Sequence, residues 1–244
     1  MLEIKNLGYT AEDGARILHD VSLRIDERFT AITGPNGGGK STLAKLIAGL
    51  YDPTEGQILF DGVDITHMSI TDRARAGISF AFQQPVRLKG LKVKDMLRLA
   101  YGKDKKKVDY CSFLSEVGLC ANDYINREID ASLSGGELKR IEIAMALARG
   151  TKLTIFDEPE AGIDLWSFQN LIRVFEKMYE EHQGNIIIIS HQERILNIAD
   201  TIVVMRGGEL AEVGPRETVL PKLLGGTTRE ACDVLLGKMG GSNA

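Results

Sequence analysis

The sequence is poor in cysteine. Its 244 residues include only Cys111, Cys120 and Cys232, and no two of them are spaced as C-x-x-C. An odd number without paired spacing suggests neither a disulfide framework nor a self-contained metal or cluster site. We therefore expect reduced thiols that are largely packed in the core.

An excess of positive charge is also lacking. Lys and Arg number 30 against 34 Asp and Glu, so the formal net charge is −4. Surfaces that bind nucleic acid carry a basic excess, so nucleic acid is not an expected partner. The one basic cluster, at residues 103–107, is more simply interpreted as a solvated loop between helices.

Long apolar runs are missing as well. No stretch approaches the ~20 apolar residues that a membrane-spanning helix needs. Residues 1–6 lack the basic region and apolar core of a signal peptide. We expect a soluble, cytoplasmic chain that does not itself insert into a membrane.

What the sequence does contain is a complete phosphate-binding motif. The stretch from Gly34 to Thr42 matches G-x-x-x-x-G-K-[ST] and lies between an apolar strand at 29–33 and an apolar helix. Its glycines leave backbone N–H groups open toward an anion at the positive end of that helix. We expect Lys40 to contact the β- and γ-phosphates of a nucleotide and Ser41 to bind Mg²⁺. The residues expected to hold the nucleotide are Gly34, Pro35, Asn36, Gly37, Gly38, Gly39, Lys40, Ser41 and Thr42.

Other apolar strands end in polar residues. Residues 78–82 precede Gln83, residues 153–156 precede Asp157 and Glu158, and residues 185–190 precede His191. Ligands gather at the carboxyl ends of strands in open parallel sheets. Asp157 fits a Mg²⁺ ligand and Glu158 could orient or deprotonate a water. Paired acids are also common in surface turns and a lone histidine is usually structural, but the P-loop favours the functional interpretation of both.

The N-terminal part predicts a β layer. Residues 2–9 and 17–25 alternate apolar and polar side chains, as two antiparallel strands joined by a polar turn would. Tyr9 lies where an aromatic ring could stack on a nucleotide base. Packing at a sheet edge explains this residue equally well.

From residue 85 to residue 150 the apolar spacing becomes helical. We expect one domain over 1–244, in which residues 1–84 and 151–244 form the core with its β layer and residues 85–150 form a helical subdomain. Near the end of that insertion, Ser134 can cap a helix while Gly135 and Gly136 expose N–H donors. The result would be a second anion-binding helix N-terminus.

Taken in order, six features resemble the ATP-binding cassette (ABC) ATPases: residues 34–42, Gln83, residues 133–137, residues 157–158, Asp164 and His191. The resemblance covers residues 2 to about 213. It implies an α/β fold with a RecA-like P-loop NTPase core, an antiparallel β subdomain and an inserted α-helical subdomain.

The same resemblance implies hydrolysis of ATP with Mg²⁺ by an ATP-dependent, head-to-tail homodimer. Each ATP would lie between the P-loop of one subunit and the 134–136 segment of the other, where Ser134, Gly135 and Gly136 supply the contacts. Gln83 and His191 would sense Mg²⁺ and the γ-phosphate, and Asp164 would cross the interface. Together with Lys40 and Glu158, His191 would be catalytic.

Within these ATPases the chain is most similar to the SufC family of the SUF iron–sulfur cluster assembly system. The similarity is carried by residues 81–86 with Gly90, residues 134–140, residues 161–164 and residues 191–196. Leu138 departs from the Lys usual in that family. Residues 143–149 and 157–159 also resemble transporter cassettes.

Two functions therefore stay open. In the first, ATP closes the dimer and remodels a SufB- or SufD-like scaffold, which would itself carry any cluster ligands. In the second, the same closure moves the coupling helices of a membrane permease. Both interpretations place the docking region near residues 83–99, from Gln83 to Leu99.

Overall fold

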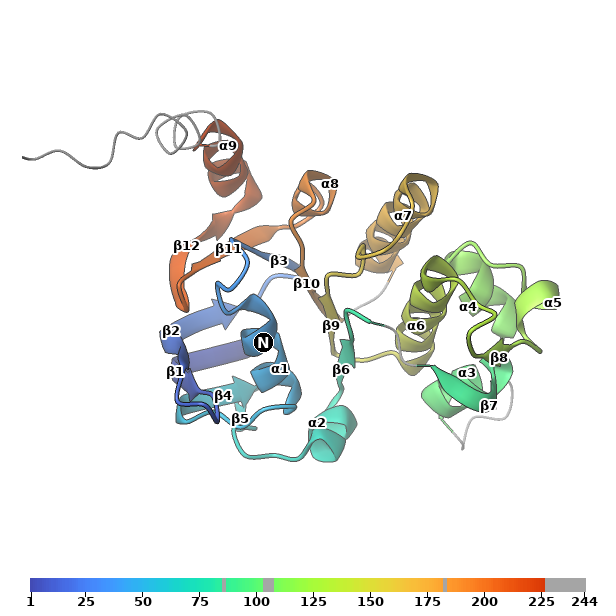
Figure 1. The fold of residues 1–244 in the computed structure, drawn as a ribbon, viewed down its shortest axis with the longest axis horizontal. Helices are drawn as coiled ribbons and strands as arrows, with labels where there is room; N and C mark the ends of the chain where they lie inside the picture. Colours follow the sequence, from blue (N-terminus) through green and yellow to red (C-terminus); the bar gives the residue numbers. More distant parts are fainter. Residues whose placement is uncertain (85–86, 103–107, 182–183, 227–244) are drawn as a thin grey trace, which may run out of the picture.

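The computed structural model describes residues 1–84, 87–102, 108–181 and 184–226. A six-stranded sheet forms its centre (Figure 1). In spatial order its strands are β12 (Glu209–Pro215), β11 (Thr201–Arg206), β3 (Phe29–Thr33), β10 (Asn185–Ile189), β9 (Leu153–Asp157) and β6 (Ile78–Ala81). The edge strand β12 is antiparallel to β11, and the other neighbouring pairs are parallel. The predicted parallel core is confirmed.

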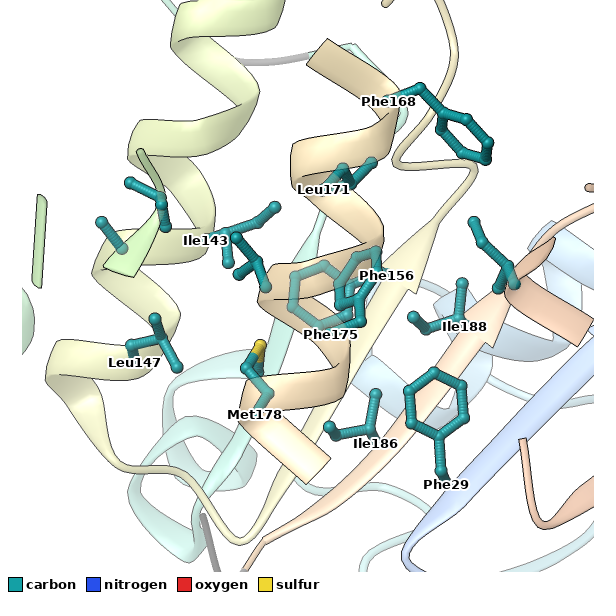
Figure 2. Packing of buried hydrophobic residues seen from close by; sticks show 14 of the residues in the cluster. Phe29, Ile143, Leu147, Phe156, Phe168, Leu171, Phe175, Met178, Ile186 and Ile188 are labelled. Carbon is teal, nitrogen blue, oxygen red and sulfur yellow. The ribbon is translucent and has the colours of Figure 1, made fainter. Parts of the chain in front are cut away.

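The two faces of this sheet bury different helices. Side chains alternate along a strand, so Ile187 and Ile155 face α1 (Lys40–Ala48), whereas Ile188 and Phe156 face the opposite side. That side is covered by α6 (Gly135–Arg149) and α7 (Leu165–Glu181). Figure 2 shows the Phe156 ring against Phe175 of α7, with ring centres 5.1 Å apart. Because both faces are buried, the strands read as continuous apolar runs.

A second sheet holds the N-terminal strands. Its order is β2 (Arg16–Ile25), β1 (Leu2–Thr10), β4 (Glu55–Phe60) and β5 (Val63–Asp64), with every neighbouring pair antiparallel. Its buried side chains join the apolar cluster that contains α1 and one face of the central sheet. The P-loop helix α1 is therefore enclosed between the two sheets (Figure 1).

The helical part contains the expected helices and two strands that the spacing did not predict. The helices are α3 (Val93–Tyr101), α4 (Tyr110–Glu116), α5 (Ala121–Tyr124) and α6, and the strands are β7 (Leu88–Lys92) and β8 (Glu128–Ile129). β7 pairs antiparallel with β8, and the pairing continues as Val93 N–H donates to the Arg127 carbonyl at 3.0 Å. The helical interpretation was wrong here because β8 has only two residues and the pairing depends on a tertiary contact.

The structure tests the expected burial of the cysteines only in part. Cys111 and Cys120 are exposed, so the expectation of core-packed thiols was wrong for these two residues. Cys111 lies on the outer side of α4 and Cys120 precedes α5. Cys232 and the basic cluster at 103–107 lie outside the described residues.

The remaining helices are α2 (Ile70–Ala76), α8 (Glu193–Leu196) and α9 (Arg216–Gly226). Among the helices that the structure describes, none combines the length and apolarity that crossing a membrane requires.

Arg73 of α2 is a fully buried cation that fixes the end of the P-loop helix. Its guanidinium donates to the carbonyls of Leu46 at 2.5 Å and Ile47 at 2.9 Å, in the last turn of α1. It also donates to the carbonyls of Thr66 at 2.8 Å and Met68 at 3.1 Å. The last carbonyls of a helix lack intrahelical partners and lie at its negative end, so a cation there is favourable.

We expect Arg73→Met to lower the free energy of unfolding by about 3 kcal/mol, because the variant leaves buried carbonyls without a donor. Urea denaturation measures this change. The matched control is Arg75→Met, two residues along the same helix with a side chain 77% exposed, which should change little. Equal stabilities of the two variants would contradict this account of Arg73.

Candidate functional site

The P-loop occupies the turn between β3 and α1, and two of its glycines have no room for a side chain. Gly34 has a φ of 129°, and a Cβ there would lie 1.9 Å from the Met205 carbonyl oxygen of β11. Gly39 precedes α1 with a φ of 91°, and its Cβ would lie 2.5 Å from a methyl group of Leu18 in β2. The loop is thus held against both sheets at the positive end of α1.

Lys40 is folded back onto this loop. Its ammonium donates to the carbonyl oxygens of Gly34 at 2.7 Å and Pro35 at 2.9 Å, and the residue is 5% exposed. Burial lowers the pKa of Lys40, and the nearby charges of Glu158 and Asp157 oppose that effect. A compact cation therefore lies at the loop where phosphates would bind.

Ser41 and Asp157 meet where α1 begins and β9 ends. The Ser41 hydroxyl donates to Asp157 Oδ1 at 2.9 Å, and Asp157 is 3% exposed. Burial raises the pKa of Asp157, and the hydrogen bond from Ser41 works against this rise. A hydroxyl and a carboxylate oxygen are hard ligands of the kind that Mg²⁺ prefers, so this pair fits the metal expected here.

The other predicted polar residues come together from three strand ends. Gln83 follows β6 and donates from Nε2 to Glu158 Oε2 at 2.6 Å. The other carboxylate oxygen of Glu158 lies 3.8 Å from Nε2 of His191, which follows β10. Glu158 itself has a φ of 45°, a strained value for a non-glycine residue, and its N–H donates to the Ile189 carbonyl at 3.0 Å.

His191 is held as a neutral imidazole. Burial is the main cause that lowers its pKa, the charge of Lys40 lowers it further, and Glu158 opposes both. A neutral ring carries one N–H donor and one acceptor. At neutral pH it can therefore donate a hydrogen bond to a phosphate oxygen without bringing a second cation beside Lys40.

Ser134 caps α6 as expected. Its hydroxyl accepts from Glu137 N–H at 3.2 Å, and Glu137 accepts from Ser134 N–H at 2.7 Å, which completes a capping box. Burial alone would raise the pKa of Glu137, but hydrogen bonds from Tyr124 and Ser134 outweigh it and hold the pKa at about 2. The carboxylate is therefore ionised throughout the physiological range and the cap persists.

Gly135 and Gly136 open α6 on the sheet face opposite to α1. A Cβ on Gly135 would lie 3.9 Å from the Gly162 carbonyl, so this segment is next to the turn that carries Asp164. Asp164 Oδ1 accepts from Ser167 N–H at 3.0 Å at the start of α7. The two helix N-termini that were predicted to bind anions thus belong to helices on opposite faces of the central sheet.

Tyr9 is placed less favourably for its predicted role. Its ring stacks on Tyr51, with centres 5.3 Å apart and an interplanar angle of 4°. That face of the ring is unavailable to a nucleotide base. The contacts of Tyr9 and of the other site residues with nucleotide and metal stay predictions.

Three residues near the site were missed by the sequence reasoning. Lys139 of α6 is 2% exposed, donates to the Phe82 carbonyl and pairs with Glu142 at 3.3 Å. Glu160 and Ser190 are joined by a hydrogen bond of 2.5 Å behind Glu158 and His191. Lys139 could have been found in the sequence as a charged residue on an apolar helix face. No spacing in the sequence indicates that Glu160 and Ser190 lie together.

Comparison of the sequence with known protein families identifies the family of this chain. Residues 18–161 match the family described as ABC transporter. The chain belongs to this family. It is an ATPase that uses ATP with Mg²⁺, and the predicted cassette fold is confirmed.

Individual relatives align with this chain over most of their length. The chain is 40% identical over 228 residues to an uncharacterized ABC transporter ATP-binding protein of Methanocaldococcus jannaschii, covering 89% of this chain and 90% of the relative. It is 35% identical over 237 residues to the probable ATP-dependent transporter ycf16 of Antithamnion sp., covering 90% and 93%. The dimeric structure of MJ0796, a bacterial ABC transporter cassette, superposes with a TM-score of 0.79 at 26% identity, covering 88% of this chain and 99% of that one.

The raised pKa of Asp157 predicts a stability difference that depends on pH. Because the folded state favours the protonated carboxyl, the cost of folding with an ionised Asp157 is absent below its unfolded pKa and grows as pH rises through its folded pKa. We expect Asp157→Asn to raise the Tm of the nucleotide-free protein by about 2 °C or more at about pH 7.5. The gain should disappear toward about pH 4, the ordinary range of Asp.

Asp72 provides a control of opposite sign. A hydrogen bond from Ser69 lowers the pKa of this exposed carboxylate, so Asp72→Asn should lower the Tm at neutral pH. Scanning calorimetry across the pH range compares the two variants. A Tm of Asp157→Asn below that of the parent at neutral pH would show that the buried carboxylate is stabilising instead.

Proposed function

We propose that the chain is the ATPase subunit of a SUF-type iron–sulfur cluster assembly complex. In this function, closure of an ATP-bound homodimer changes the shape of a SufB- or SufD-like scaffold that is docked on the helical subdomain. The observation that carries the choice of partner is the set of SufC-like residues, in particular Gly162 and residues 191–196. Two features of the structure support the mechanical part of this proposal.

The first feature is the placement of the two anion-binding helix N-termini. α1 and α6 pack on opposite faces of the central sheet (Figure 1). Ser134, which caps α6, therefore belongs to the face away from the P-loop of its own chain. A second copy in head-to-tail orientation would bring its Ser134 to the nucleotide. The dimer reported for the similar cassette MJ0796 supports this arrangement.

The chemistry at the nucleotide would fall to residues from four segments. Lys40 would exchange its carbonyl partners for phosphate oxygens, and Ser41 with Asp157 would hold Mg²⁺, which neutralises phosphate charge. Glu158 would accept a hydrogen bond from the attacking water, and neutral His191 would donate to the γ-phosphate. The hydrogen bond from Gln83 would keep the Glu158 carboxylate aimed at that water.

The second feature is a cavity at the predicted docking region. It has a volume of about 680 Å³ and lies between β6, α3 and α6. Its apolar lining includes Phe82, Met96, Leu99 and Met145. Leu99 is 53% exposed and Phe82 is 38% exposed, which is unusual for large apolar side chains. An apolar helix or loop of a partner fits such a surface.

The second candidate is the nucleotide-binding subunit of a membrane permease. It is favoured by Leu138, where the SufC family usually has Lys, and by the transporter-like residues 143–149. The names of the relatives also describe transporters. The same cavity would then receive a coupling helix of the permease.

The adjacent acids should differ in function. Glu158→Gln keeps the shape of the side chain but removes the base, so hydrolysis should fall by about 10²–10⁴-fold while ATP still binds. Asp157→Asn should weaken binding of the Mg²⁺–ATP complex as well as turnover. Single-turnover hydrolysis measured together with ATP occupancy and light scattering separates these outcomes.

Lys40→Ala, which should abolish hydrolysis, sets the zero level of that assay. We expect Glu158→Gln to accumulate as an ATP-loaded dimer and Asp157→Asn not to do so. Turnover of Glu158→Gln within about twofold of the parent would exclude Glu158 as the base.

The partner can be identified by co-purification under anoxic conditions. We expect soluble scaffold chains to be recovered with the parent, and Leu99→Glu to lose them because a charge would enter the apolar cavity. Ile70→Glu is the matched control, since Ile70 is 51% exposed on α2 and does not line the cavity. Recovery of a membrane permease with the parent would favour the second candidate and refute the first.

A further inference from the structure

Glu160 is a carboxylate that the turn after β9 carries into the interior. Its Oε1 accepts a hydrogen bond from the Ser190 hydroxyl at 2.5 Å. Its Oε2 is buried, and no donor of the described residues forms a hydrogen bond with it. A buried polar atom without a partner costs on the order of 1–3 kcal/mol, so stability alone gives no reason for this residue.

Ser190 holds the loop that presents His191. It is fully buried directly after β10, and its N–H donates to the Ile32 carbonyl at 3.1 Å. Its hydroxyl accepts from Gln192 N–H at 3.0 Å while it donates to Glu160. The residues on both sides of His191 are thereby fixed to one hydroxyl group, whose direction is set by the Glu160 carboxylate.

Glu160 also belongs to the turn that leads to Asp164. Ala161 N–H donates to the Glu158 carbonyl at 3.0 Å, and Ile163 N–H donates to the Glu160 carbonyl at 3.1 Å. These bonds make residues 158–163 a compact unit. Because β9 and β10 are neighbours, this turn and the His191 loop leave the sheet at the same edge.

Burial raises the pKa of Glu160. The Ser190 hydroxyl and the backbone N–H groups of Glu160 and His191 oppose that rise, and the charge of Glu158 adds to it. Oε1 accepts the Ser190 hydrogen bond in either protonation state. A glutamine at this position would also keep an acceptor oxygen for Ser190, which makes Glu160→Gln a conservative variant.

We propose that Glu160 is a positioning residue that fixes His191 through Ser190 and couples this histidine to the turn ending at Asp164. The inference rests on the proposed dimer, in which Asp164 lies at the interface. Movement of that turn when the dimer closes then reaches His191 of the same chain through the Glu160–Ser190 hydrogen bond.

Steady-state hydrolysis by the full chain with Mg²⁺ and ATP tests the proposal. We expect Glu160→Met and Ser190→Ala each to lower kcat about tenfold and to leave KM within about twofold. The double variant should be no slower than either single variant, because both single changes remove the same hydrogen bond. Glu160→Gln should stay within about threefold of the parent. Glu193→Gln, at an exposed position at the start of α8, should match the parent.

Histidine NMR provides a readout that a merely structural role would not give. The sequence has four histidines, so the His191 ring signal can be assigned by its loss in His191→Gln. We expect this signal to move in Glu160→Met and in Ser190→Ala, and to return in Glu160→Gln. Urea midpoints verify that each variant is folded, and Ser190→Ala tests the same bond if Glu160→Met does not fold.

Parent values of kcat and of the His191 signal in both Glu160→Met and Ser190→Ala would overturn the inference. So would a double variant whose loss equals the product of the two single losses. Failure of the parent to dimerise with ATP would overturn the coupling of His191 to the dimer interface. The positioning of His191 by Glu160 and Ser190 is compared within a single chain and is judged by the kcat and NMR results.

Discussion

The hydrogen bond from Ser41 to Asp157 joins residues 116 positions apart, and the rest of the site depends on it. It ties the start of the P-loop helix to the end of a central strand, which brings the loop and the acidic residues to one place. It also keeps a carboxylate that is 3% exposed in a position where its ionised form is poorly solvated. Lys40 is likewise a buried charge, and its ammonium is bound by the carbonyls of its own loop. The site thus holds charges in internal contacts that phosphate and Mg²⁺ can replace.

The two-faced sheet sets the second constraint. The P-loop helix α1 packs on one face and α6 packs on the other, because each helix buries an apolar side of its own. The same packing that stabilises the fold therefore separates the two helix N-termini that are predicted to bind anions. In the proposed function, a second chain would bring the two helix N-termini together at one nucleotide, so nucleotide binding and assembly would be parts of one process.

The segment that follows β6 connects the site to the outer surface. Gln83 contacts Glu158, while the residue before it, Phe82, accepts a hydrogen bond from Lys139 of α6 and lines the apolar cavity. One short segment thus contacts Glu158 at the end of the sheet, the helix α6 and the cavity that is proposed as the docking region. A partner seated in the cavity would touch the backbone that positions Gln83. Lys139 is buried, so a shift of α6 relative to the sheet would move that backbone as well.

The sequence by itself determined the elements whose signal is local. The P-loop glycines, the apolar run at 185–189, the Ser134 cap and the acids at 157–158 each follow from residues next to one another. The parallel core and the polar residues that meet at its edge could therefore be predicted, while their roles stay predictions. Tertiary structure alone decided the rest. The β7–β8 pairing, the exposure of Cys111 and the Tyr9–Tyr51 stacking all depend on which surfaces the fold leaves covered. The contacts of Arg73 and Glu160 could not be predicted either. No sequence spacing relates a buried charge to its hydrogen-bond partner when only the folded chain brings the two together.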